Sequence, residues 1–203
     1  LHLLLANPAL LAVAGPFLVL WLLSPLIAWW VSRPLAAHKV SLSAEQRIFL
    51  RRIARRTWAF FERFVGPEDH WLAPDNYQEY RIAAMAHRTS PTNMGLALLA
   101  NLAAHDFGFI PGGRLLERTA STLRTMTGLA RYRGHFYNWY DTQTLEPLPV
   151  LYVSTVDSGN LAGHLLTLRG GLLALADERI LTPRLFAGLG DTLGLLADNL
   201  DGA

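Results

Sequence analysis

The densest group of chemically active side chains in the sequence lies between Gly134 and Asp141. This segment, GHFYNWYD, holds four aromatic rings together with a histidine, an amide and a carboxylate. Sugars need this mixture, because flat rings cover their apolar C–H faces while polar side chains satisfy hydroxyl groups that are costly to bury without partners. The segment therefore predicts a carbohydrate-binding loop.

A second carboxylate, Asp157, stands in the segment STVDSGN directly before a predicted helix. The free N–H groups at a helix N-terminus favour the ionised form of such an Asp. Two carboxylates at one pocket suit glycoside chemistry, one as the acid and the other as the base or nucleophile. Asp141 and Asp157 are therefore the candidate catalytic residues, and their spacing leaves both the retaining and the inverting course open.

Each candidate also has a purely structural interpretation. Asp157 or Ser158 could simply cap a helix, and Asp141, which precedes Thr142, could simply form a turn. Core packing is the alternative for His87, His164, Tyr137 and Trp139, and helix capping is the alternative for Arg88, Thr89 and Ser90. No histidine pair has the spacing of a zinc site and the chain has no cysteine, so we expect neither a metal nor another cofactor.

The elements that must position these residues are predicted to be helices, because strand-like alternation is nearly absent. The N-cap signal Ser90-Pro91 predicts a helix that stops near Gly108. Further helices are predicted at 114–130, 160–176 and 183–199. The candidate residues fall in the two long connections, 71–89 and 131–160, and long ordered connections are usually functional. The predicted fold class is all-α.

The N-terminal residues 3–31 are apolar apart from Asn7 and Ser24, which is long enough for a membrane span. Arg33 and Lys39 follow directly, so the positive-inside rule puts the C-terminal side in the cytoplasm. A signal peptide fits less well, because the apolar run is too long and the positive charges come after it. A buried soluble helix, or a re-entrant pair split by the prolines, remains an alternative.

Residues 33–66 form a basic segment, with eight Lys and Arg against Glu45 and Glu62. The capping-box pattern from Ser43 to Gln46 predicts a helix over 44–65. Its apolar stripe is predicted from Ile48, Phe49, Ile53, Phe60, Phe61 and Phe64. The arginines could face anionic lipid headgroups, or their stems could cover the core. The whole chain carries a net charge of only +2, which gives no support to nucleic-acid binding.

Three motifs carry a family resemblance: HRTSPTN from His87, HFYNWYDT from His135 and VSTVDSGNLAGHL from Val153. The region 43–175 that contains them resembles the glycoamylase-like domain of cyclic β-1,2-glucan synthases, which are large bacterial membrane enzymes. The resemblance implies an α/α toroid of paired helices that joins linear β-1,2-glucan to itself by transglycosylation. It also implies a glycosyltransferase domain upstream and a phosphorylase-like domain downstream in the same polypeptide.

On this resemblance the motif loops line the sugar cleft, with Asp141 and Asp157 as the catalytic candidates. The implied substrate-binding residues are Asp75, Asn76, Gln78, Glu79, His87, Arg88, Thr89, Asn93, His135, Tyr137, Asn138, Trp139, Tyr140 and Asn160. The chain offers only the first hairpins of a toroid, so we expect the main catalytic acids beyond residue 203. Asp141 and Asp157 would then orient the sugar, and this part alone would be inactive.

The predicted organisation is a transmembrane segment at 1–32, a basic juxtamembrane helix at 33–66 and a partial glycoamylase-like domain at 67–203. The predicted partners are linear β-1,2-glucan, the lipid bilayer and the other domains of the polypeptide. The expected location is the bacterial inner membrane, with the helical domain on the cytoplasmic side. The alternative function is a non-catalytic β-glucan-binding or membrane-scaffold module. A weaker alternative is a lipid anchor formed by the arginines between Arg47 and Arg56.

Overall fold

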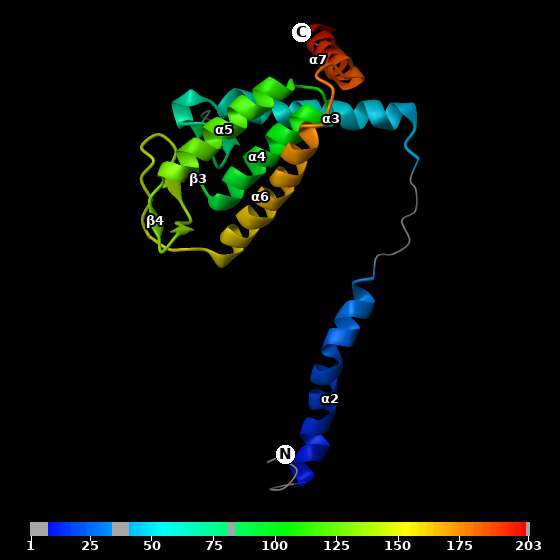
Figure 1. Cartoon of the computed structure of the whole chain (residues 1–203), viewed down its shortest axis with the longest axis vertical. Coiled ribbons are helices and arrows are strands. Elements are labelled where there is room, and N and C mark those ends of the chain that lie inside the picture. The colour runs from blue at the N-terminus through cyan, green and yellow to red at the C-terminus, as the bar shows by residue number, and fades with distance from the viewer. Residues whose placement is uncertain (1–7, 34–40, 81–83, 202–203) are drawn as a thin grey trace. The chain divides into compact units, whose positions relative to one another are not determined.

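A computed structural model describes residues 8–33, 41–80 and 84–201 of the chain. The chain divides into two compact units, Leu1–Leu42 and Ser43–Ala203 (Figure 1). The second unit is mostly helical and carries all the candidate site residues. The predicted all-α class is confirmed at the level of the helices, and short strand pairs are added in the loops.

The first unit is built around helix α2, Pro8–Val31, which continues through Pro16 and Pro25 without a break. Its stretch Ala12–Val31 is 20 residues long and apolar, and none of its residues is buried. At about 1.5 Å per residue this stretch matches the roughly 30 Å thickness of the hydrocarbon layer. The Arg33 guanidinium lies 3.9 Å from the Trp29 ring, a pairing suited to a membrane interface. Helix α2 is thus a candidate membrane span, and residues 1–7 of the predicted run lie outside the described residues.

Helix α3, Ala44–Phe64, opens the second unit with the predicted capping box. The Gln46 N–H donates to Ser43 Oγ at 3.1 Å, and the Ser43 N–H donates to Gln46 Oε1 at 2.9 Å. The predicted apolar stripe is only partly correct. Trp58, Phe60, Phe61 and Phe64 pack inward, whereas Ile48, Phe49 and Ile53 are exposed.

Helix α4, Pro91–Asp106, lies at the centre of this unit and contacts α3, α5 and α6 (Figure 1). Helix α5 spans Gly112–Gly128, α6 spans Thr155–Leu175 and α7 spans Pro183–Asp201. The main core forms where α4, α5 and α6 meet the loops, from Leu72, Met94, Leu98, Met126, Leu129, Tyr140, Leu161 and Leu168. Leu115 of α5 joins Trp58 of α3 in a second cluster, but Leu116 is exposed.

The predicted start of the third helix needs a correction. Helix α6 begins at Thr155, and its N-cap is Ser154, so neither Asp157 nor Ser158 is the cap. The Ser154 hydroxyl accepts the Asp157 N–H at 3.1 Å. Asp157 therefore lies inside the first helical turn, where its carboxylate faces the positive end of the helix dipole.

In the described parts of the predicted loops, the structure has three two-stranded antiparallel ladders. They pair β1 (Tyr77–Gln78) with β2 (Ala84–Met85), β3 (Arg88–Thr89) with β6 (Tyr140–Asp141), and β4 (Arg131–Tyr132) with β5 (His135–Phe136). The β3–β6 pair matters most for function, because it joins the two long connections. Its register sets Arg88 opposite Asp141 and Thr89 opposite Tyr140.

Candidate carbohydrate-binding site

Asp157 is the centre of a hydrogen-bonded group at the N-termini of α4 and α6. The Ser154 hydroxyl donates to its Oδ2 at 2.6 Å, and the Thr92 hydroxyl donates to its Oδ1 at 2.7 Å. Asn160, one turn further along α6, donates from Nδ2 to Thr92 Oγ1 at 3.1 Å. The two helix starts are therefore tied together through one carboxylate.

Asn138 connects this group to the aromatic loop. In the amide orientation that satisfies all its neighbours, Nδ2 donates to Asp157 Oδ2 at 3.0 Å. Its oxygen accepts from the Tyr152 hydroxyl at 2.6 Å and from Trp139 Nε1 at 2.9 Å. The aromatic segment 134–141 and the start of α6 thus converge. We call Thr92, Asn138, Trp139, Tyr152, Ser154, Asp157 and Asn160 the Asp157 cluster.

The hydrogen bonds of the cluster decide the charge of Asp157. Burial works to raise the pKa of its carboxyl group. Hydrogen bonds from the side chains of Ser154, Thr92 and Ser90, and from the Thr92 backbone, outweigh burial and hold the pKa below its ordinary value. Asp157 is therefore an anion at neutral pH, fit to accept a sugar hydroxyl hydrogen or to act as a base, and unfit to donate a proton.

Asp75 organises a second polar group, which borders the Trp139 ring. Arg88 donates to Asp75 Oδ2 from Nε at 3.1 Å and from Nη2 at 2.8 Å. Asn93 and Asn76 also donate to this carboxylate, at 3.4 and 3.1 Å. The Arg88 guanidinium lies 4.8 Å from the centre of the Trp139 ring, so this group and the Asp157 cluster share Trp139.

His87 is held by a buried carboxylate that the sequence did not single out. Its Nδ1 lies 2.8 Å from Asp69 Oδ1, and the Thr142 hydroxyl donates to the same oxygen. The Asp69 side chain is only 6% exposed, whereas that of His87 is 37% exposed. Asp69 therefore holds the ring of His87 through Nδ1 and leaves part of the ring accessible.

The backbone directly after Asp69 is strained. The next two residues, His70 and Trp71, have φ angles of 52° and 63°, in the left-handed region that side chains with a Cβ rarely adopt. Two α5 hydroxyls hold their carbonyls, with Thr125 donating to His70 O at 2.7 Å and Thr122 to Trp71 O at 2.9 Å. Such strain persists only where surrounding contacts enforce it.

Asp141 forms a turn, which was the structural interpretation that the sequence offered for this residue. Its Oδ1 accepts the backbone N–H groups of Gln143 and Thr144, each at 2.8 Å. The Thr144 hydrogen bond is the main reason that the pKa of Asp141 lies below its ordinary value, and the Gln143 bond adds to it against the effect of burial. Like Asp157, Asp141 is an anion at neutral pH.

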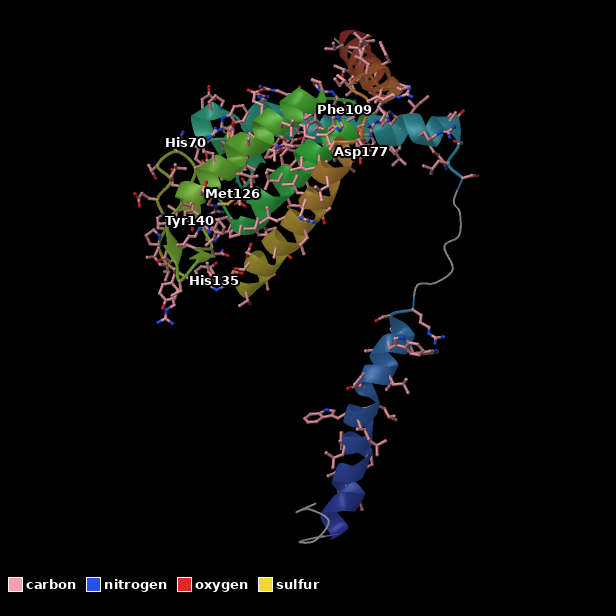
Figure 2. All side chains as sticks on the ribbon, viewed as in Figure 1. His70, Phe109, Met126, His135, Tyr140 and Asp177 are labelled. Carbon is pink, nitrogen blue, oxygen red and sulfur yellow. The ribbon has the colours of Figure 1, made fainter. Side chains whose placement is uncertain are left out.

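The other predicted site residues lie in different surroundings. Tyr140 is fully buried, and burial raises the pKa of its hydroxyl group. This hydroxyl donates to Ala130 O at 2.6 Å and accepts the Tyr137 N–H at 2.8 Å. Thr89 is also fully buried. Gln78 and Glu79 are exposed at strand β1. His135 is exposed on the β4–β5 pair, and it lies well separated from His70 (Figure 2).

Sequence reasoning missed four residues that complete these groups: Asp69, Thr92, Tyr152 and Ser154. Thr92 and Ser154 stand inside the quoted motifs as possible capping residues, and that signal could have found them. Asp69 and Tyr152 carry no local signal, because their partners are 18 and 14 residues away. Among the described residues, no group of three or more His, Asp and Glu side chains could hold a metal ion.

The helical hairpins with polar groups in their loops define a glucoamylase-like fold. A crystal structure of a candidate glucoamylase from Bacteroides fragilis NCTC 9343 superposes with a TM-score of 0.54. The match covers 77% of this chain and 36% of that one, at 17% sequence identity. At that identity the likeness concerns the fold alone, and no protein-family model matches the chain.

The sequence comparison is more specific. Over 152 residues, the chain is 46% identical to the cyclic β-(1,2)-glucan synthase NdvB of Rhizobium meliloti (strain 1021). The match covers 74% of this chain but only 5% of that enzyme. The resemblance predicted from the motifs is therefore confirmed, and the chain is homologous to one segment of a cyclic β-1,2-glucan synthase.

Proposed function

We propose that this chain is a segment of a membrane-bound cyclic β-1,2-glucan synthase, and that its loops hold linear β-1,2-glucan in the cyclisation domain. The observation that supports this most strongly is Asn138, which bonds both the Trp139 indole and the Asp157 carboxylate. A flat ring and a hydroxyl-accepting anion are thereby fixed next to each other. A glucose unit presents a C–H face and hydroxyl groups in the same arrangement.

Asp157 orients the sugar in this proposal. The cluster directs one hydrogen bond to Oδ1 of this carboxylate and two to Oδ2, which holds the anion in place beside the Trp139 ring. Asp157 is only partly buried, so a sugar hydroxyl can still reach it. Because Asp157 stays ionised, the acid that protonates a leaving oxygen has to come from another residue.

The alternative of a non-catalytic glucan-binding module is supported by the same carboxylates. Asp141 and Asp157 both have lowered pKa values, so neither is suited to donate a proton at neutral pH. This alternative predicts binding that is independent of ring formation. An assay that measures glucan binding and cyclisation on the same variant therefore distinguishes the two functions.

The proposed setting is the bacterial inner membrane, with α2 as the span of segment 1–32 and the helical domain at 67–203 in the cytoplasm. The bilayer, a glycosyltransferase domain upstream and a phosphorylase-like domain downstream are the proposed partners besides the glucan. In the basic segment 33–66, Arg51 pairs with Asp191 at 2.7 Å and Arg52 with Asp198 at 3.2 Å. These ion pairs support a role of this face of α3 in packing against α7, and they count against its role as a lipid anchor.

The test is cyclisation of linear β-1,2-glucan by the full-length membrane protein in detergent. Asp157→Asn keeps the size of the side chain but removes the anion, so ring formation should fall by about tenfold. Asp106→Asn, an exposed acid at the end of α4, is the matched control and should leave the rate unchanged. Equal rates for Asp157→Asn and the unaltered protein would remove Asp157 from the proposed site.

A further inference from the structure

A pocket of about 340 Å³ lies beside the Asp157 cluster and shares only Tyr152 with it. We call it the tyrosine pocket, and its walls are Tyr132, Tyr137, Leu151, Tyr152 and Val153. Its volume is within the roughly 300–1,000 Å³ typical of small-ligand sites. Tyr132 and Tyr152 are about half exposed, at 51% and 48%, so the pocket opens to solvent.

One wall of the pocket is anchored in the core. The Tyr137 ring packs edge-on against the buried Tyr140 ring at 6.4 Å, and its backbone N–H bonds the Tyr140 hydroxyl. Tyr132 stands on strand β4, where the Arg133 guanidinium lies 5.4 Å from its ring. The pocket therefore has one fixed aromatic wall and others that a ligand can reach from solvent.

The tyrosine pocket is continuous with the Asp157 cluster through Tyr152. The Tyr152 carbonyl accepts the Asn138 backbone N–H at 2.9 Å, and its hydroxyl bonds the Asn138 side chain at 2.6 Å. Asn138 in turn donates to Asp157. A ligand in the pocket would thus lie one hydrogen-bonded residue away from the proposed sugar-orienting carboxylate.

The chemistry of the walls selects among ligands. Three aromatic rings and two aliphatic side chains offer flat apolar surface, and three phenol hydroxyls offer donors and acceptors. The Tyr152 hydroxyl already bonds the Asn138 side chain, but a purely apolar partner that covered the Tyr132 and Tyr137 hydroxyls would offer them no hydrogen bond. None of the five lining side chains is charged, and the Arg133 guanidinium beside the pocket is stacked on the Tyr132 ring. A neutral polyol with apolar faces fits the walls best.

We propose that the tyrosine pocket is a second sugar subsite, which holds a glucose unit of the chain next to the unit oriented by Asp157. This inference rests on the proposed function and adds Tyr132 and Tyr152 as residues that contact substrate. A chain that occupies both places is held at two successive points, which favours one direction of the glucan across the loops.

The experiment is equilibrium binding of linear β-1,2-glucan to the full-length protein in detergent. Tyr132→Ala should weaken binding by about tenfold through loss of the stacking ring, while Tyr132→Phe keeps the ring and should retain most of the affinity. Tyr152→Phe should weaken binding by a smaller factor, because it removes only the link to Asn138. Phe186→Ala, an exposed aromatic residue on α7, is the control and should bind as the unaltered protein does.

The outcomes separate the subsite from the function on which it rests. Unchanged binding by Tyr132→Ala, with weakened binding by Asp157→Asn, overturns the subsite and leaves the proposed function standing. Unchanged binding by Tyr132→Ala together with a lowered melting temperature shows that the ring packs against protein, which also overturns the subsite. No binding of β-1,2-glucan by the unaltered protein overturns the proposed function and the subsite together.

Discussion

At the scale of single residues, hydrogen bonds set the charge state of the candidate site. Asp157 receives donors from α4, from the start of α6 and from the aromatic loop. The donors from Ser154, Thr92 and Ser90 favour the anion over the acid and outweigh the burial that works in the opposite direction. Asp157 therefore joins the two helix starts, and in the proposed function the same anion accepts a sugar hydroxyl.

The lowered pKa of Asp157 predicts a pH-dependent contribution to stability. The stabilisation is complete above the ordinary pKa of 3.8 and is lost as the pH falls through the lower folded value. Asp157→Asn should lower the free energy of unfolding by about 1–2 kcal/mol at pH 7, because two hydroxyl groups lose a charged acceptor. Urea denaturation from pH 7 to pH 2 should bring the two proteins together at the acidic end, and a constant gap would contradict the linkage.

Asp69 provides a second prediction about single residues. Asp69→Ala removes the buried acceptor of His87 and Thr142, so it should lower the free energy of unfolding by about 2–4 kcal/mol. Glu68→Ala, at the exposed neighbouring position, should change it by less than about 0.5 kcal/mol. Urea denaturation followed by tryptophan fluorescence measures both, and equal effects would show that Asp69 does not hold the loop.

Sequence predicted the residues of the site only in part, and the reason is physical. The segments around Trp139 and Asp157 stood out by their rings and carboxylates, and Asn138 joins the two residues in the structure, while sugar binding by them stays a prediction. Tyr140 has the same residue type as Tyr137 yet is buried, and composition cannot tell which rings face inward. Asp69 was missed because a carboxylate beside a turn has no local sign of burial.

At the scale of elements, the helices were predictable from their ends. Ser43 and Ser90 cap α3 and α4 as predicted, and Gly108, with a φ of 80°, follows the end of α4. These signals are local, since a cap satisfies N–H groups of its own helix. The strands were not predictable, because two-residue ladders such as β3–β6 have no alternation and form only when the helices bring two loops together.

The contact between α4 and α6 predicts opposite effects for two glycines. An alanine Cβ at Gly95 would lie 2.9 Å from Cβ and Cγ of His164, whereas at Gly163 it would meet nothing within 4 Å. Gly95→Ala should destabilise the protein by about 1–3 kcal/mol through overpacking. Gly163→Ala should be neutral or stabilise it by up to about 1 kcal/mol through helix propensity. Thermal unfolding compares them, and a stabilising Gly95→Ala would contradict the close helix contact.

At the scale of the whole molecule, the apolar helix and the helical unit have different roles. Helix α2 exposes Phe17, Trp21, Leu22 and Trp30 to their surroundings, as suits contact with lipid. Three arginines of α3 are engaged with their own unit: Arg55 bonds Thr192, Arg51 bonds the Phe107 carbonyl, and Arg52 pairs with Asp198. We therefore propose that α2 attaches the chain to the membrane and that these arginines serve helix packing.

This division of roles predicts how the chain attaches to membranes. Deleting residues 1–33 should release the protein from anionic vesicles, because Arg51, Arg52 and Arg55 of the remaining basic helix are engaged with α7. Changing Arg51 and Arg52 to Gln in the intact chain should leave vesicle binding unchanged, and should lower the free energy of unfolding by about 1 kcal/mol. Vesicle co-sedimentation at low and high salt measures attachment. Salt-sensitive binding by the deletion variant would instead support a lipid anchor in α3.

The central claim is that the loops joined by Asn138 hold a glucan chain. The most direct measurement is a structure of the full-length protein bound to linear β-1,2-glucan. We expect one glucose unit with a hydroxyl within hydrogen-bonding distance of Asp157, and the next unit against Tyr132 and Tyr152. A glucan chain bound elsewhere, with solvent over both Asp157 and the tyrosine pocket, would contradict it.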